Sequence, residues 1–313
     1  RDRSPSRGLG DVYKRQAFMG KTYTVEEATF DSFKGIDIAL FAGGSISKDF
    51  APHAVKAGAV VIDNSSAFRM DPEVPLVVPE VNPQAILKHK GIIANPNCST
   101  IIMVMALKPI YDLAKIKRVI VSTYQAVSGA GKEGIDELDA QVRDHSEGRE
   151  MTANILPSAS AEKHYPIAFN LIPQIDVFCD NLYTKEEMKM VNETKKIMED
   201  YEMRITATTI RVPVYRSHSE SVNIELEKEV DLGAMREALA KFPGVTVQDD
   251  PSKQEYPMPL YTSEKDDVYV GRLRRDESCE KSYNMWVVGD QIRKGAALNT
   301  LQIAETMIKN GWI

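Results

Sequence analysis

A cysteine stands in residues 95–100, Asn-Pro-Asn-Cys-Ser-Thr, between a short apolar segment and a long one. Asn, Ser and Thr are residue types that begin helices, and the apolar run 101–107 predicts that a helix follows. We therefore expect Cys98 at a helix N-terminus, where unpaired N–H groups and the helix dipole favour a thiolate. Such a thiolate is a nucleophile, although a free cysteine can equally be a buried and inert residue.

His218 is the best candidate for the acid or base partner of this thiol. It is expected in a turn between two strands, whereas the other four histidines lie in charged or helical contexts. A Cys and a His that are distant in sequence can meet in a fold, and His exchanges protons near neutral pH. The alternative is a solvated loop histidine.

Cations at three positions could bind an anionic substrate. Arg211 lies on an expected strand, Arg69 follows the end of another, and Lys189 lies on an expected helix. Arginine binds carboxylate or phosphate through a bidentate fork. The alternatives are surface ion pairs for the two arginines and a solvated helix face for the lysine.

The composition is that of a globular protein with about two domains. The chain has 313 residues, 43% of them hydrophobic, and no apolar run approaches a membrane span. The net charge of -6 argues against binding to nucleic acid. Three widely spaced cysteines favour a reducing cytoplasm over a disulfide framework, and no spacing of Cys and His predicts a metal site.

The first third of the chain predicts a doubly wound parallel sheet of the Rossmann-like type. Strand-like runs alternate with at least one helix, and these strands are expected at residues 36–42, 59–63, 74–78 and 91–94, with the helix at 51–58. Ligands bind at the carboxyl ends of strands in such sheets. Those ends carry Gly43-Gly44-Ser45, residues 64–69, and Asn97-Cys98.

The remainder of the chain predicts an α+β domain with a mixed or antiparallel sheet. Alternating polar and apolar residues predict half-buried strands at 204–214, 221–228, 267–273 and 283–288. Helices are expected at 134–143, at 184–199 with a capping box, and at 296–308. In the last of these, Ala297, Leu301, Ala304 and Ile308 form the expected buried stripe.

Residues 1–16 lack hydrophobic periodicity and carry five Lys or Arg against two Asp. We expect them to be an expression or sequence-assembly scar and exclude them from fold prediction. No glycine-rich turn of the GxGxxG type precedes residue 36, so the Rossmann-like domain is expected to be N-terminally truncated. A missing first βα unit predicts weakened cofactor binding and an exposed sheet edge.

Several segments, in one order from about residue 20 to the end, resemble the bacterial aspartate-β-semialdehyde dehydrogenases. They are residues 43–45 (GGS), 63–69 (DNSSAFR), 78–83 (VPEVNP), 95–100 (NPNCST), 124–131 (YQAVSGAG), 211–214 (RVPV), 218–221 (HSES) and 293–299 (RKGAALN). The resemblance implies an NADP-dependent enzyme that converts L-4-aspartyl phosphate to L-aspartate 4-semialdehyde, for lysine, threonine and methionine biosynthesis. It also implies a cytoplasmic homodimer that binds neither nucleic acid nor membranes.

The resemblance assigns roles to individual residues. It implies that Cys98 attacks the acyl phosphate and forms a thioester, that His218 is the acid and base, and that Gln125 orients the substrate. Substrate binding is implied for Arg211, at the carboxylate, for Arg69, Asn97 and Lys189, at the phosphate, and for Glu186. Cofactor binding is implied for Gly43, Gly44, Ser45, Ser128, Gly129 and Gln291; the family pattern has Asn in place of Gln291.

The resemblance also implies the domain boundaries. Residues 17–97 with 293–313 are expected to form the NADP-binding domain, and residues 98–292 the catalytic and dimerisation domain. Two alternatives remain: an N-acetyl-γ-glutamyl-phosphate reductase, which performs the same chemistry on a longer acyl phosphate, and a truncated, cofactor-deficient relative without enzyme activity.

Overall fold

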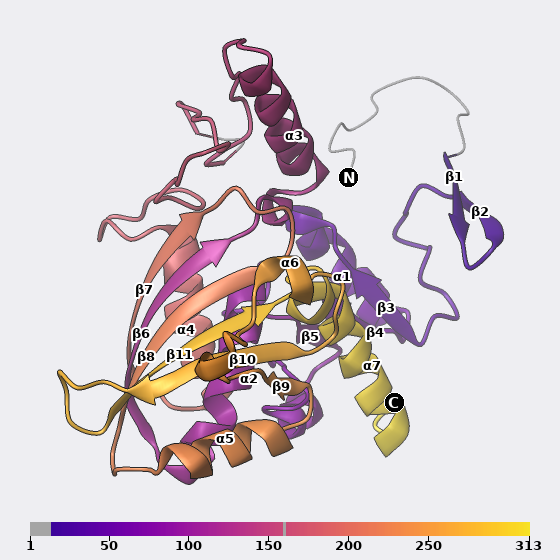
Figure 1. Cartoon of the computed structure of the whole chain (residues 1–313). Coiled ribbons are helices and arrows are strands. Elements are labelled where there is room, and N and C mark those ends of the chain that lie inside the picture. Colours follow the sequence, from indigo (N-terminus) through magenta and orange to yellow (C-terminus); the bar gives the residue numbers. More distant parts are fainter. Residues whose placement is uncertain (1–13, 159–160) are drawn as a thin grey trace.

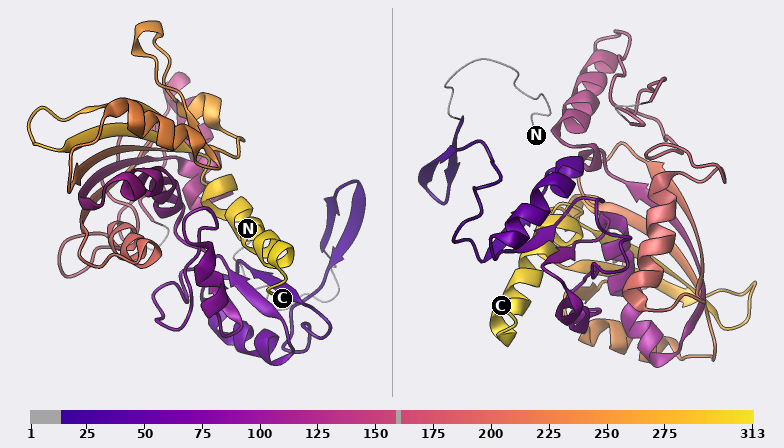
Figure 2. Two further views of the ribbon diagram at one scale, coloured as in Figure 1. Left: turned by 90° about the horizontal axis from the view of Figure 1, so that it is seen from below. Right: turned by 180° about the vertical axis from the view of Figure 1, so that it is seen from behind.

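A computed structural model describes residues 14–158 and 161–313 (Figure 1). Of the expected leader, residues 1–13 lie outside the described residues. Residues 14–16 belong to strand β1 (Lys14–Phe18), which pairs antiparallel with β2 (Lys21–Val25). This hairpin stands apart from the rest of the molecule in all three views (Figures 1 and 2).

The first large unit is a parallel sheet with the strand order β3-β4-β5. Its strands are β3 (Ile38–Phe41), β4 (Val60–Asp63) and β5 (Ile92–Ala94), and α1 (Ser47–Lys56) connects the first two. The expected Rossmann-like arrangement is confirmed. Within the described residues β3 forms one edge, and its Leu40 side chain is 48% exposed.

The strand expected at 74–78 is wrong, because this segment forms only a single bridge, between Leu76 and Ala94. Pro75 lies within this segment and Pro79 follows it, and proline has no N–H to extend a ladder.

The second unit is a six-stranded mixed sheet with the order β7-β6-β8-β11-β10-β9. It confirms the expected α+β domain. Only the β6–β7 and β9–β10 pairs are parallel. The strands are β6 (Ile116–Gln125), β7 (Arg204–Arg211), β8 (His218–Leu226), β9 (Val245–Val247), β10 (Val268–Arg275) and β11 (Ser282–Gly289).

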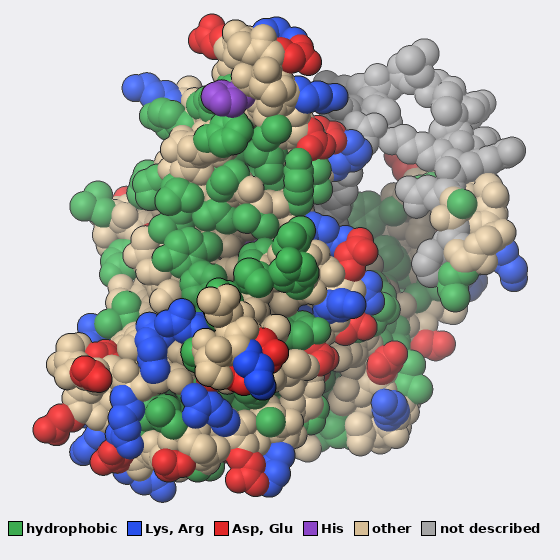
Figure 3. Space-filling model, in the orientation of Figure 1, with side chains coloured by type: hydrophobic (Ala, Val, Ile, Leu, Met, Phe, Trp, Pro, Cys, Tyr) green, Lys and Arg blue, Asp and Glu red, His purple; other side chains and the backbone are tan. Residues whose placement is uncertain are grey.

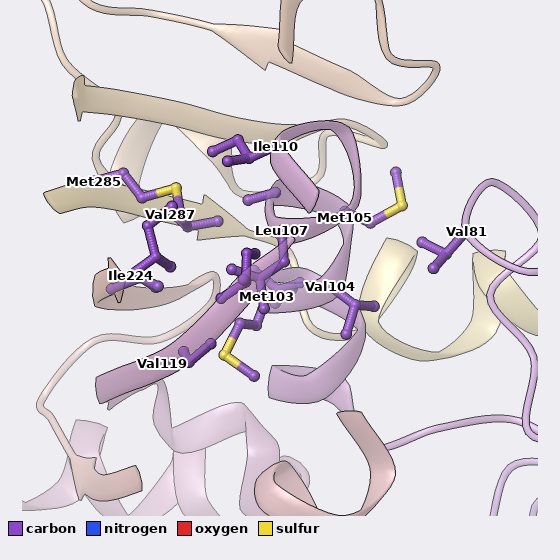
Figure 4. Close-up of a cluster of buried hydrophobic side chains, with 14 of the residues drawn as sticks. Val81, Met103, Val104, Met105, Leu107, Ile110, Val119, Ile224, Met285 and Val287 are labelled. Atoms are coloured by element: carbon purple, nitrogen blue, oxygen red, sulfur yellow. The ribbon is translucent and has the colours of Figure 1, made fainter. Parts of the chain in front are cut away.

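Three helices pack against this sheet: α2 (Cys98–Leu113), α4 (Lys185–Met198) and α5 (Leu232–Lys241). Helix α2 is apolar almost all round, which is typical of a helix buried at the centre of a domain. Figure 4 shows Met103, Leu107 and Ile110 of α2 packed toward Val119 and Val287 of the sheet. This packing fixes the position of α2 on the sheet.

Helix α3 (Lys132–Ser146) and a long irregular segment complete the second unit at the top of Figure 1. Short helical turns occur at η1 (Gly44–Ile46), η2 (Pro83–Lys88), η3 (Val127–Ala130), η4 (Pro251–Lys253) and α6 (Pro259–Thr262). No helix in the described part of the chain has the length and apolar character needed to cross a membrane.

The chain returns to the first unit through a π-helical turn, η5 (Arg293–Ala297), and α7 (Leu298–Asn310), which packs against β4 and η2. The expected stripe on α7 is wrong: Leu301 is 48% and Ile308 62% exposed. The buried face instead carries Asn299, Ile303 and Met307, because the Asn299 amide donates to Asn95 and to the carbonyl of Val77.

Candidate active site

Cys98 is the first residue of α2, as the sequence predicts. Asn97 caps this helix: its backbone is extended after Pro96, and its Oδ1 accepts the N–H of Thr100 at 3.2 Å. Behind Cys98 lies Gly295 of η5, where a Cβ atom would stand 3.1 Å from the Cys98 Cβ. The absence of a side chain at position 295 therefore lets the π-helical turn support the nucleophile.

His218 lies beside this thiol, with its Nε2 3.5 Å from the Cys98 Sγ. The turn expected around His218 is wrong: it is the first residue of β8 and fully buried. The Ala126 N–H donates to Nδ1 at 3.0 Å, so the neutral ring carries its proton on Nε2, toward the sulfur. Burial and the nearby charge of Arg211 lower the pKa of His218 well below its usual value.

The surroundings of Cys98 favour the protonated thiol, whereas the helix N-terminus alone would favour the thiolate. Burial, and then the negative charge of Glu186, raise its pKa to about 12. Arg69, Arg211 and the Ser99 N–H act in the opposite direction but are outweighed.

Glu186 joins three of the predicted site residues. Its Oε1 accepts from the amides of Asn97 at 2.8 Å and Gln125 at 3.3 Å, and its Oε2 pairs with the Lys189 ammonium at 3.1 Å. Burial alone would raise the pKa of Glu186, but Lys189 and these hydrogen bonds lower it. Lys189 is not a solvated helix residue, since it also pairs with Asp176 at 2.9 Å.

Gln125 ends β6 and faces the same space. Its Oε1 accepts from the Thr123 hydroxyl at 2.9 Å, which fixes the direction of the amide, and its Nε2 lies 3.5 Å from the His218 Nε2. The Gln125 N–H₂ group therefore points toward the imidazole that contacts Cys98.

Arg211 approaches from β7 and is buried. Its Nη1 donates to the Ala126 carbonyl at 2.6 Å, while its Nε has no hydrogen-bond partner. A Cβ at Gly129 would lie only 2.8 Å from this Nη1 and 3.4 Å from the His218 ring. The solvent-accessible Gly129 thus leaves open the approach to both side chains.

Arg69 is also buried, so neither arginine is a surface ion pair. Its Nη1 pairs with Glu193 at 3.2 Å, and its Nη2 donates to the Asn64 carbonyl at 3.1 Å. Burial raises the pKa of Glu193 above its usual value, and the opposing charge of Arg69 offsets only part of this rise. The sequence analysis missed Glu193, yet its spacing from Glu186 and Lys189 (i, i+3, i+7) places all three on one helix face.

The expected cofactor residues lie in two places. Gly43, Gly44 and Ser45 are exposed at the carboxyl end of β3, and a Cβ at Gly44 would meet no atom within 4 Å. In the second place, the Gln291 amide donates to the Ser128 hydroxyl and accepts the Ser217 N–H at 2.8 Å. Gly44 in the first place, and the exposed Gly129 beside Ser128 in the second, offer a ligand open backbone without a side chain, so the residues present fit a nicotinamide dinucleotide. Among the described residues, no group of three or more His, Cys, Asp and Glu is arranged to hold a metal ion.

Comparison with known sequences first defines the class. Residues 2–89 match the NAD binding domain of semialdehyde dehydrogenases, and residues 107–294 match their dimerisation domain. The chain thus combines a nicotinamide-binding domain with the second domain of this enzyme class.

Individual relatives define the family. The chain is 57% identical to the aspartate-semialdehyde dehydrogenase of Aquifex aeolicus, over 95% of the chain and 86% of the relative. It is 54% identical to that of Bacillus subtilis, over 93% and 85%. The crystal structure of aspartate semialdehyde dehydrogenase II of Vibrio cholerae complexed with ASA superposes with a TM-score of 0.89 at 46% identity, over 95% and 86% of the two chains. The chain belongs to the aspartate-semialdehyde dehydrogenase family of oxidoreductases. The comparisons do not favour the two alternatives, an N-acetyl-γ-glutamyl-phosphate reductase and a relative without enzyme activity.

Proposed function

We propose that this chain converts L-4-aspartyl phosphate to L-aspartate 4-semialdehyde with NADPH, through a thioester on Cys98. The observation that carries the proposal is the Cys98–His218 contact of 3.5 Å at the start of α2, together with two buried arginines, Arg69 and Arg211, whose charges act on this thiol. A substrate with a carboxylate at one end and an acyl phosphate at the other needs two fixed cations on either side of a nucleophile.

Arg211 is the group for the substrate carboxylate, because it lies with the His218 ring next to the exposed Gly129 and its buried Nε donor has no hydrogen-bond partner. Arg69, with Asn97 and Lys189, is the group for the phosphate. Glu186 contributes to substrate binding by fixing Asn97 and Lys189, and Gln125 orients the acyl group beside the thiol. Charge pairing at both ends holds the carbonyl carbon next to Sγ.

In the chemical step, the S–H bond of Cys98 breaks and the sulfur forms a bond to the acyl carbon. The bond from that carbon to the phosphate oxygen breaks, and phosphate leaves with the electron pair and takes up the thiol proton, as hydrogen phosphate. The neutral His218 stabilises the sulfur anion through Nε2–H and later the oxygen that becomes negative. Acting as a base at Nε2 requires the ring proton on Nδ1, and the Ala126 N–H opposes that tautomer. This backbone contact therefore limits how readily His218 accepts a proton.

NADP is the proposed cofactor, bound by Gly43, Gly44 and Ser45 at β3 and by Ser128, Gly129 and Gln291 near the thiol. When bound, its reduced form supplies the two electrons that take the thioester to the aldehyde level. The chain's own contribution is to orient the thioester and to exclude water from the buried side of Cys98. The NAD binding domain match supports a nicotinamide cofactor, and the family resemblance supports NADP.

A homodimer is the proposed assembly, with residues 98–292 as the catalytic and dimerisation domain and 17–97 with 293–313 as the cofactor domain. The match of 107–294 to a dimerisation domain supports it. Figure 3 shows a broad apolar area on one face, and exposed apolar side chains within that match include Phe169, Leu171, Tyr215, Leu260 and Tyr261. Light scattering tests the dimer.

The cytoplasm is the proposed location of the protein, and the three free cysteines support it.

The test of the proposed function is reduction of NADP by the purified chain with L-aspartate 4-semialdehyde, with and without phosphate. We expect reduction that requires phosphate and is lost in Cys98→Ser. The longer N-acetyl-glutamyl semialdehyde is the matched substrate control and is expected to react poorly. Equal activity of Cys98→Ser, or preference for the longer aldehyde, would overturn the proposal.

A further inference from the structure

One carboxylate connects the phosphate side of the site to the helix that carries the nucleophile. Glu193 of α4 is 1% exposed. Its Oε1 pairs with the Arg69 Nη1 at 3.2 Å, and its Oε2 accepts the backbone N–H of Asn97 at 2.6 Å. Asn97 is the N-cap residue of α2, directly before Cys98. Glu193 therefore fixes the distance between the guanidinium of Arg69 and the start of α2.

The rest of the Arg69 side chain shows what this arrangement leaves open. The Arg69 Nη2 donates to the Asn64 carbonyl at 3.1 Å, while the buried Arg69 Nε has no hydrogen-bond partner. Most buried donors in proteins are hydrogen-bonded, so an unpaired one beside a nucleophile indicates an anion that binds there. Glu193 and Asn64 thus bind two of the three guanidinium nitrogens, Nη1 and Nη2, and Nε remains without a partner.

We propose that Glu193 is a positioning residue for phosphate binding, which acts by holding Arg69 and the Asn97 backbone in a fixed relation to Cys98. The inference rests on the proposed function, because it takes the anion at Arg69 to be phosphate. Glu193 does not touch the substrate itself. Its replacement is expected to weaken phosphate binding selectively, since Gln has one acceptor oxygen for two donors.

Glu187 provides a matched control on the same helix. It is also buried, and its oxygens accept the backbone N–H groups of Thr184 at 2.7 Å and Thr209 at 3.0 Å. Both contacts stabilise the start of α4 and its packing on β7, and neither reaches a site residue. Glu187→Gln therefore reproduces the loss of a buried charge without affecting Arg69.

The experiment measures binding of inorganic phosphate by the protection it gives Cys98 against alkylation, with no cofactor present. For Glu193→Gln we expect roughly a tenfold or greater rise in the phosphate concentration that gives half protection. Glu187→Gln is expected to match the wild-type chain. In the full assay, the KM for phosphate should rise in Glu193→Gln while the KM for semialdehyde changes less than about threefold.

The outcomes separate the two proposals. No protection of the wild-type chain by phosphate would refute the proposed function and the inference with it. Protection of the wild-type chain with an unchanged half-protection value in Glu193→Gln would refute the inference alone. If Glu193→Gln fails to fold, Glu193→Asp replaces it: the shorter side chain keeps the charge, and wild-type phosphate binding in this variant would equally overturn the inference.

Discussion

Replacing Gly129 by alanine tests whether the open backbone at this position is needed for substrate binding. The added Cβ would lie 2.8 Å from the Arg211 Nη1, whereas ordinary contacts begin at 3.4 Å, so Nη1 must move by the difference of 0.6 Å. That movement disturbs the hydrogen bond that Nη1 donates to the Ala126 carbonyl at 2.6 Å. Arg211 then no longer presents its free Nε at the same place.

A hydrogen bond from a charged group contributes about 1.5–3 kcal/mol, and 1.4 kcal/mol corresponds to a factor of ten. We therefore expect Gly129→Ala to lower kcat/KM for the semialdehyde by about 10- to 150-fold. Most of this loss should be in KM, because the substrate carboxylate does not change during the reaction. The free energy of unfolding should change by less than about 1 kcal/mol, since the displaced atom is at the end of a side chain.

Steady-state kinetics with semialdehyde, phosphate and NADP varied in turn is the assay. The KM for phosphate is the internal control, because Glu193 and the Asn64 carbonyl hold Arg69 and neither contacts Gly129. The KM for NADP reports any contact of Gly129 with the cofactor. An unchanged KM for semialdehyde in a folded Gly129→Ala variant would refute the assignment of Arg211 to the substrate carboxylate.

Three further predictions follow from the buried charges. Lys294 is 1% exposed and pairs with Glu80 at 2.5 Å. Lys294→Met leaves this carboxylate unpaired and should lower the free energy of unfolding in urea by about 3–5 kcal/mol, and adding Glu80→Gln should restore part of the loss. Equal stability of Lys294→Met and the wild-type chain would contradict this. Because the pKa of Cys98 is raised to about 12, its alkylation rate should increase by about tenfold per unit from about pH 7 to about pH 10, and a plateau near neutral pH would contradict the raised value. Ala126 has φ -63, which proline accepts, and Ala126→Pro removes the N–H that donates to the His218 Nδ1. Because this N–H favours the neutral ring, its loss should raise the pKa of His218 toward its usual value, as read from the pH dependence of kcat. An unchanged pH profile would exclude control of His218 by this contact.

Much of the fold could be predicted because local pattern and tertiary structure agree. Periodicity predicted the parallel and mixed sheets, and the Asn-Cys-Ser-Thr sequence after Pro96 predicted the start of α2 at Cys98. Helix α5 and strand β9 were missed. The α7 stripe was misplaced because Asn299, a polar residue, is buried by hydrogen bonds that only the tertiary fold supplies.

The sequence predicted the properties of site residues poorly where those properties depend on burial. The sequence placed Cys98 at a helix N-terminus, which favours a thiolate, but it could not show that burial and Glu186 raise the thiol pKa instead. Nor could it show that His218 begins a strand with its Nδ1 on a backbone N–H. Glu193 resembles an ordinary helix glutamate in sequence, and only its contacts with Arg69 and Asn97 distinguish it.

The most direct test of the account is to look for the covalent intermediate on Cys98. The chain is mixed with freshly prepared L-4-aspartyl phosphate in the absence of any nicotinamide cofactor, quenched in acid, digested and analysed by mass spectrometry. We predict one aspartyl group on the peptide that contains Cys98, released by hydroxylamine and absent from Cys98→Ser. An aspartyl group on another residue, or none while the wild-type chain still forms semialdehyde with NADPH, would contradict the central claim that Cys98 is the nucleophile.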